Sequence, residues 1–214
     1  MSRVAAPIDE KLSMNYLLVT FEIMLVVVAP LLALYLKGSW PLRITVPCLL
    51  TIPLLWYLTY SPLHELSHVA GTYLVGGKVT SIKIIPSFWI GEFGRAWITS
   101  EGVTDKWHQL ITTASPYLFD LLCLVASIYV LQRKLSRNAF VIGFLFMLLC
   151  LRPGFDFVCE TIGFVSGDKG DFHHVDLILG NVLTWSFLLA SIGFCSFMIF
   201  TILRRFRGFP GAAT

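Results

Sequence analysis

Five long runs of apolar residues alternate with short polar segments along the chain. A helix needs about 20 mostly apolar residues to cross the hydrocarbon core of a bilayer. The runs that reach or approach this length cover residues 16–36, 44–74, 110–131, 139–165 and 182–203. The pattern therefore predicts an all-α, polytopic integral membrane protein with about five transmembrane helices.

Two of these runs contain interruptions. The second run, 44–74, is too long for one straight crossing and contains Pro47, Pro53 and Pro62. We therefore expect kinks or a re-entrant part there, because proline removes a backbone donor and clashes with the preceding turn. In the fourth run, Arg152 and Pro153 follow a short apolar stretch, so we expect a broken helix.

The segment between the second and third runs has a different character. Gly76 and Gly77 mark the end of the helix, and residues 78–85 alternate in part and are rich in β-branched side chains. Such a pattern is typical of a strand. Residues 88–102 are aromatic and punctuated by glycine, which fits a second strand or an interfacial loop. We therefore expect a short membrane-associated β segment here.

The composition supports a membrane protein and excludes other classes. Hydrophobic residues make up 56% of the 214 residues, and charged residues make up only 14%, whereas soluble domains carry roughly a quarter charged residues. A net charge of +3 spread over many short loops forms no basic stripe, so nucleic acid is not expected as a partner. The five cysteines show no C-x-x-C spacing, so neither disulfides nor a thiolate zinc site is indicated. We interpret residues 1–214 as one membrane domain.

One short motif inside the second run carries chemistry. The residues His64-Glu65-Leu66-Ser67-His68 form an H-E-x-x-H sequence. Histidines four residues apart share one face of a helix and can bind one metal ion. Glu65 points about 100° away, where it can reach a metal-bound water and act as a general base. The motif predicts a catalytic zinc site.

The position of the motif strengthens this interpretation. A charged residue at the centre of a transmembrane helix costs about 2.5–3.5 kcal/mol on insertion scales. Ionisable residues inside apolar spans therefore mark functional sites by default. A hydrogen-bonded pair of structural histidines is the weaker reading of His64 and His68.

Two histidines leave a catalytic zinc site incomplete, because such sites have three protein ligands and one open position. The second and fourth spans run in the same direction, so Asp156 should approach the membrane face where the histidines lie. Asp156 is therefore our first choice for the third ligand. Asp171 is the second choice and Glu160 the third.

These motifs resemble those of the site-2 protease family of intramembrane zinc metalloproteases. The match begins with residues 61–71, which contain the H-E-x-x-H sequence, and continues with the glycines and strand of residues 76–82. Residues 114–116, Ala-Ser-Pro, stand where the family often has Ala-Gly-Pro. Residues 151–156, Leu-Arg-Pro-Gly-Phe-Asp, stand where it has a proline-rich turn followed by the Asp that ligates zinc. The resemblance covers about residues 55–165, which would form the core of a small family member.

The resemblance implies an enzyme that acts inside the membrane. The expected function is a zinc metalloendopeptidase that cleaves a transmembrane or membrane-anchored protein, with Zn²⁺ on His64, His68 and Asp156 and with Glu65 as the catalytic base. The alternative is a non-proteolytic membrane protein of the same fold, whose structural metal site helps it bind transmembrane helices. Glu65 favours the enzyme, since a structural site needs no base at that position.

Overall fold

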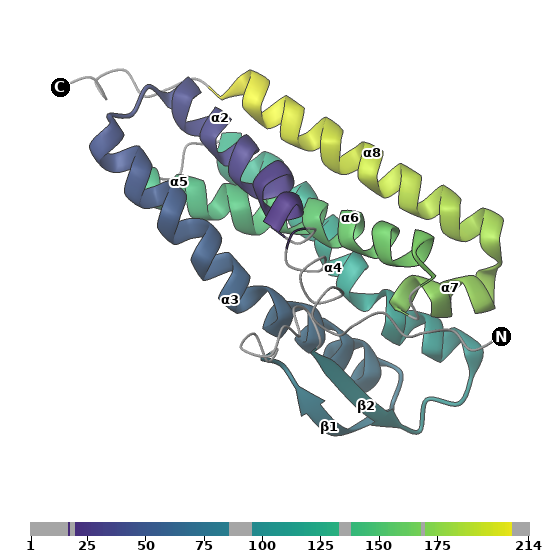
Figure 1. The fold of residues 1–214 in the computed structure, drawn as a ribbon. Coiled ribbons are helices and arrows are strands. Elements are labelled where there is room, and N and C mark those ends of the chain that lie inside the picture. Colours follow the sequence, from purple (N-terminus) through teal and green to yellow (C-terminus); the bar gives the residue numbers. More distant parts are fainter. Residues whose placement is uncertain (1–16, 18–19, 86–95, 133–137, 168–169, 207–214) are drawn as a thin grey trace, which may run out of the picture.

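The fold is taken from a computed structural model, which describes residues 17, 20–85, 96–132, 138–167 and 170–206 (Figure 1). Within these residues, five helices are long and apolar enough to cross a membrane. They are Thr20–Gly38, Leu42–Leu74, Lys106–Val130, Ala139–Val165 and Asn181–Arg205. The bounds lie within a few residues of the apolar runs. The prediction of a multi-pass membrane protein with five helical spans is confirmed.

The helices and strands follow one another in a simple order. In sequence they are the π-helical stretch η1 (Ile23–Val28), α2 (Ala29–Gly38), α3 (Leu42–Leu74), β1 (Lys78–Lys83), β2 (Trp97–Glu101), α4 (Lys106–Gln132), α5 (Ala139–Phe146), the π-helical stretch η3 (Met147–Leu151), α6 (Arg152–Val165), α7 (Asp171–Leu179) and α8 (Asn181–Arg205). The fourth span, formed by α5, η3 and α6, is the most enclosed, because 67% of its most apolar stretch is buried, against 28 to 33% for the other spans.

The fourth span continues through Pro153, and this corrects the broken helix expected from the sequence. The π-helical stretch η3 ends at Leu151, two residues before this proline. The first span repeats the arrangement, since η1 ends at Val28 and Pro30 follows. A π-helical turn is wider than an α-helical one, so it leaves room for a proline ring that would otherwise clash with the preceding turn.

The second span, α3, is one continuous helix of 33 residues that includes all three of its prolines. It does not fold back as the re-entrant alternative would require. At 1.5 Å per residue the helix is about 50 Å long, which exceeds the roughly 30 Å hydrocarbon core of a bilayer. Its C-terminal half carries the H-E-x-x-H motif and reaches the end of the molecule where β1, β2 and α7 lie (Figure 1).

A β-hairpin follows α3, where the sequence predicts a short β segment. Gly76 ends the helix with a φ of 79°, a left-handed conformation that favours glycine. Strands β1 and β2 then pair antiparallel, with Lys78 opposite Glu101 and Lys83 opposite Trp97. The predicted strand at 78–85 is confirmed, and the second segment forms a strand at its end. Residues 88–95 lie outside the described residues.

Close packing of α3 against α4 brings the Ala-Ser-Pro sequence of residues 114–116, the second sequence motif, close to the H-E-x-x-H motif. A Cβ atom built on Gly71 would lie 1.9 Å from Ser115 Oγ and 3.1 Å from Thr112 Cα. Only a glycine allows the two backbones to approach this closely, as small residues do in membrane helix pairs. The contact sets α4 directly beside the helical turn that carries His68.

Candidate metal centre

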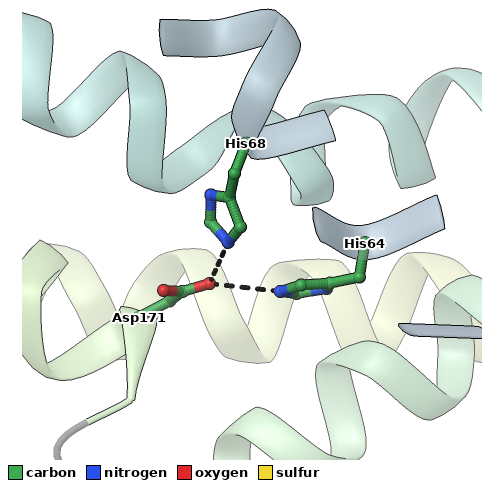
Figure 2. Close-up of side chains that lie close together, drawn as sticks. All are labelled: His64, His68 and Asp171. Carbon is green, nitrogen blue, oxygen red and sulfur yellow. Dashed lines mark ion pairs between the residues drawn. The ribbon is translucent and has the colours of Figure 1, made fainter. Parts of the chain in front are cut away.

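Three side chains from two helices converge on one point. His64 and His68 extend from successive turns of α3, and Asp171 is the first residue of α7 (Figure 2). Asp171 Oδ2 lies 3.4 Å from His64 Nε2 and 3.0 Å from His68 Nε2. One ligand atom from each residue lies within 4.8 Å of the others, so this group could hold a metal ion.

The second ring nitrogen of each histidine is held by an acceptor. His68 Nδ1 lies 2.9 Å from the carbonyl oxygen of Thr112, and His64 Nδ1 lies 3.2 Å from Asp156 Oδ1. Carbonyl and carboxylate oxygens only accept, so the Nδ1 atom of each histidine carries a proton and donates the hydrogen bond. The Nε2 atoms face Asp171, which also only accepts, so each Nε2 would give up its proton and offer its lone pair when a metal ion occupies the shared point. Histidine ligands of metals are commonly oriented in this way.

Two of the three spacings between the ligand atoms match those around a tetrahedral ion. Ligand atoms about 2.1 Å from a tetrahedral zinc ion stand roughly 3.4 Å apart. The two distances to Asp171 Oδ2, 3.4 and 3.0 Å, are close to this value. Two imidazoles and one carboxylate are also a common donor set for zinc in catalytic sites. The residues present therefore fit the ion.

Asp171 is fixed by a further contact. Tyr117 donates a hydrogen bond of 3.0 Å to Asp171 Oδ2 from α4, directly after Pro116 of the second sequence motif. Burial by itself raises the pKa of Asp171, but hydrogen bonds from His64 and His68 outweigh it and hold the pKa below its ordinary value. The carboxylate is therefore an anion at neutral pH, as a metal ligand must be.

Asp156, the first choice from the sequence, lies on the other side of the His64 ring. Both of its oxygens are within 3.3 Å of His64 Nδ1, and its side chain is only 1% exposed. It also accepts a hydrogen bond from Tyr60. Asp156 reaches the same membrane level as the histidines, as the topology suggests, but it contacts the nitrogen opposite the shared point. Its role as a ligand stays a prediction.

The converging atoms open onto a large cavity of about 740 Å³. Its walls come from α3, α4, β2, α6 and α7, and they include the three grouped residues. Glu65 lines the cavity and is 7% exposed. Glu160, the third choice for a ligand, and His174 line it as well, although neither belongs to the His64, His68 and Asp171 group. A general base candidate thus shares one cavity with the possible metal ligands.

Several residues of the site were not singled out from the sequence. Tyr60, Thr112 and Tyr117 carry no signal by type, because tyrosine and threonine are common in membrane helices. Arg152, in contrast, did carry a sequence signal. It is a charged residue inside an apolar run, which by default indicates function, yet we interpreted it as the boundary of a broken helix. It is instead fully buried and paired with Asp120.

Comparisons with protein-family models, with curated proteins and with solved structures found no match to this chain.

Proposed function

We propose that the protein is an intramembrane zinc metalloendopeptidase. The observation that carries this proposal is the convergence of His64, His68 and Asp171 at the wall of a cavity that also contains Glu65. Structural zinc sites are closed by four protein ligands, whereas catalytic sites have three and keep one position open. Three grouped ligands facing a 740 Å³ cavity fit the catalytic class.

Asp171 is proposed as the third ligand in preference to Asp156. Asp171 Oδ2 contacts the Nε2 atoms of both histidines, so one ion can bind all three groups. Asp156 contacts only His64, at the nitrogen that faces away from that point. Its position suits a carboxylate that orients a ligand histidine, which is a frequent partner of metal-bound imidazole.

The chemistry proposed for the cavity is peptide hydrolysis. A divalent zinc ion supplies Lewis-acid polarisation of the scissile carbonyl and makes a bound water more acidic. Glu65 would accept the proton of the attacking water and later donate it to the leaving amine. The Nδ1 atoms of His64 and His68 would stay protonated throughout. Their hydrogen bonds to the Asp156 carboxylate and to the Thr112 carbonyl would hold both rings in place.

The proposed substrate is a transmembrane or membrane-anchored protein. The cavity lies among helices long and apolar enough to span a bilayer, and Trp97, Ile98 and Ser100 of β2 form part of its wall. A helical substrate must unwind locally before its peptide bond can reach a catalytic group. The hairpin offers exposed strand edges along which an unwound segment could pair. The resemblance of the H-E-x-x-H region to site-2 proteases supports the same substrate class.

The proposal is tested with detergent-purified protein in two steps. Elemental analysis should give about one zinc ion per chain in the wild type and in Glu65→Gln, because Glu65 is not a ligand. Cleavage of model transmembrane substrates should occur with the wild type and be lost in Glu65→Gln. If the wild-type protein contains no zinc even after incubation with a zinc salt, the proposed metal site is wrong. Equal zinc with no cleavage by the wild type would favour the structural-site alternative.

A further inference from the structure

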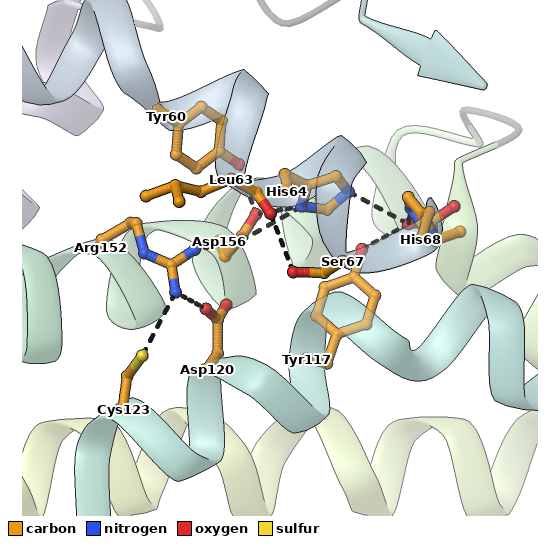
Figure 3. Close-up of polar contacts among 11 residues, drawn as sticks. Tyr60, Leu63, His64, Ser67, His68, Tyr117, Asp120, Cys123, Arg152 and Asp156 are labelled. Carbon is orange, nitrogen blue, oxygen red and sulfur yellow. Dashed lines mark hydrogen bonds and ion pairs between the residues drawn. The ribbon is translucent and has the colours of Figure 1, made fainter. Parts of the chain in front are cut away.

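We infer that Arg152 and Asp120 position the ligand histidine His64 through Asp156, which makes them positioning residues of the metal site. This inference rests on the proposed metal centre. It concerns a row of charged groups from three helices that runs away from the cavity into the protein interior (Figure 3). The H-E-x-x-H motif itself does not require Asp120, Arg152 or Asp156.

The first argument is the number of buried charges. Arg152, Asp120 and Asp156 are all fully buried inside apolar spans. Burying charges is costly even when they are paired. An ion pair between Arg152 and Asp120 would already be neutral, so packing alone gives no reason for a second carboxylate beside the guanidinium. A role for Asp156 toward another group accounts for it.

The second argument is the geometry around Arg152. One guanidinium nitrogen, Nη2, donates to Asp120 Oδ1 from α6 across to α4. The other, Nη1, lies 3.7 Å from Asp156 Oδ2, one helical turn further along α6. The planar fork of arginine presents these donors in fixed directions. Asp120 therefore sets the orientation of the guanidinium, and the guanidinium faces one side of the Asp156 carboxylate.

The third argument concerns the other contacts that the Asp156 carboxylate accepts. Tyr60 donates to Asp156 Oδ1 from α3, and His64 Nδ1 lies 3.2 and 3.3 Å from the two carboxylate oxygens. Tyr60 hydrogen-bonds to one carboxylate oxygen, and the Arg152 guanidinium attracts the other oxygen from 3.7 Å without a hydrogen bond, so the carboxylate is held from two sides. The ring of His64 that it holds is thereby kept with Nε2 directed at Asp171.

The row of contacts therefore joins three helices to one ligand. Asp120 comes from α4, Arg152 and Asp156 from α6, and His64 from α3. Its effect on a bound metal should appear as affinity and geometry, since Asp120, Arg152 and Asp156 do not belong to the His64, His68 and Asp171 group. Loss of a group that orients a metal ligand typically weakens metal binding by about 10- to 100-fold.

The decisive variant replaces both members of the ion pair, as Asp120→Asn with Arg152→Met, so that neither member is left buried without its partner. The zinc dissociation constant is measured by chelator competition in detergent, and the visible spectrum of the cobalt-substituted protein reports ligand geometry. We expect zinc binding about 10- to 100-fold weaker than in the wild type, an altered cobalt spectrum, and thermal unfolding that stays cooperative.

A purely structural ion pair gives the opposite result. The double variant would then bind zinc as tightly as the wild type, with an unchanged cobalt spectrum, and the inference would be overturned. If the double variant does not fold, Arg152→Lys serves instead. It keeps the charge but loses the fork, so it should weaken zinc binding if the fork positions Asp156, and unaltered binding would overturn the inference.

The wild-type measurement separates this inference from the proposed function. A wild-type protein that binds no zinc removes the metal centre and both proposals with it. A wild-type protein that binds zinc while the variants bind it equally well removes only the role of Arg152 and Asp120. The assay needs no substrate, so it does not depend on whether cleavage is observed.

Discussion

Two carboxylates flank the ring of His64, and they differ in almost every respect except their distance from it. Asp156 lies 3.2 Å from Nδ1, is 1% exposed, and is surrounded by Tyr60 and Arg152 within the apolar spans. Asp171 lies 3.4 Å from Nε2, is 23% exposed, and borders the cavity. Distance to one histidine therefore does not identify a metal ligand.

The second histidine resolves the difference between them. Asp171 Oδ2 also lies 3.0 Å from His68 Nε2, whereas the Nδ1 atom of His68 is held by the carbonyl of Thr112. A ligand must face the point where all donor atoms meet, and a positioning group must face away from it. The two aspartates thus allow the two proposed roles to be compared on a single imidazole.

Asp171→Asn tests the ligand side and should have the largest effect. An amide oxygen is a much weaker ligand for zinc than a carboxylate, and only two histidines would remain. We expect the purified variant to lose the zinc that the wild type retains, as measured by elemental analysis. Full zinc content in this variant would contradict the assignment of Asp171.

Asp156→Asn tests the positioning side on the same ring. The amide keeps an oxygen that can accept from His64 Nδ1, but it loses the charge that attracts Arg152. We expect zinc to bind at the wild-type ratio with an affinity about 10- to 100-fold lower, measured by chelator competition. Complete loss of zinc here, with normal binding in Asp171→Asn, would exchange the two roles and restore the first choice made from the sequence.

The two tyrosines that contact the aspartates allow a finer comparison. Tyr117 donates to Asp171 and Tyr60 donates to Asp156. A hydrogen bond to a charged group is worth about 1.5 kcal/mol or more, which corresponds to roughly tenfold in affinity. We expect Tyr117→Phe to weaken zinc binding by about this factor. Tyr60→Phe, which acts only through Asp156, should have a smaller effect in the same assay.

Ser67→Ala should have the smallest effect and serves as a matched control. Ser67 lies between the two histidines in the motif, but its hydroxyl donates to the carbonyl of Leu63 within α3, at 2.8 Å. It contacts neither aspartate through this bond. We expect zinc affinity and thermal unfolding close to the wild type. A marked loss of zinc would show that general disturbance of this helical turn, and not the loss of a particular contact, explains the other variants.

The sequence predicted the scaffold and half of the site for clear physical reasons. A bilayer requires long apolar helices, so the five spans are visible as runs of apolar residues along the chain. The spacing of His64 and His68 is fixed by the helical repeat, so their common face required no knowledge of the fold. The first strand of the hairpin was visible because β-branched residues follow two glycines where the apolar pattern stops.

The remaining parts of the site depend on contacts that no local pattern encodes. Asp171 follows a connection after the fourth span, and the path of a connection is set by tertiary packing. Topology could place Asp156 at the level of the histidines, but it could not say which face of the His64 ring it would meet. Arg152 was misinterpreted because its partner, Asp120, is far away in sequence and on another helix.

The distribution of the site over the chain has a consequence for its biosynthesis. Because the ribosome extends the chain from the N-terminus, α3 with its complete H-E-x-x-H motif is made before α6 and α7. A nascent chain that has inserted only its first three spans therefore carries both histidines and Glu65, but neither Asp156 nor Asp171. The proposed metal centre could form only once the fourth span has inserted and α7 has docked, so an unfinished chain in the membrane would have the recognisable motif without the complete group of proposed ligands.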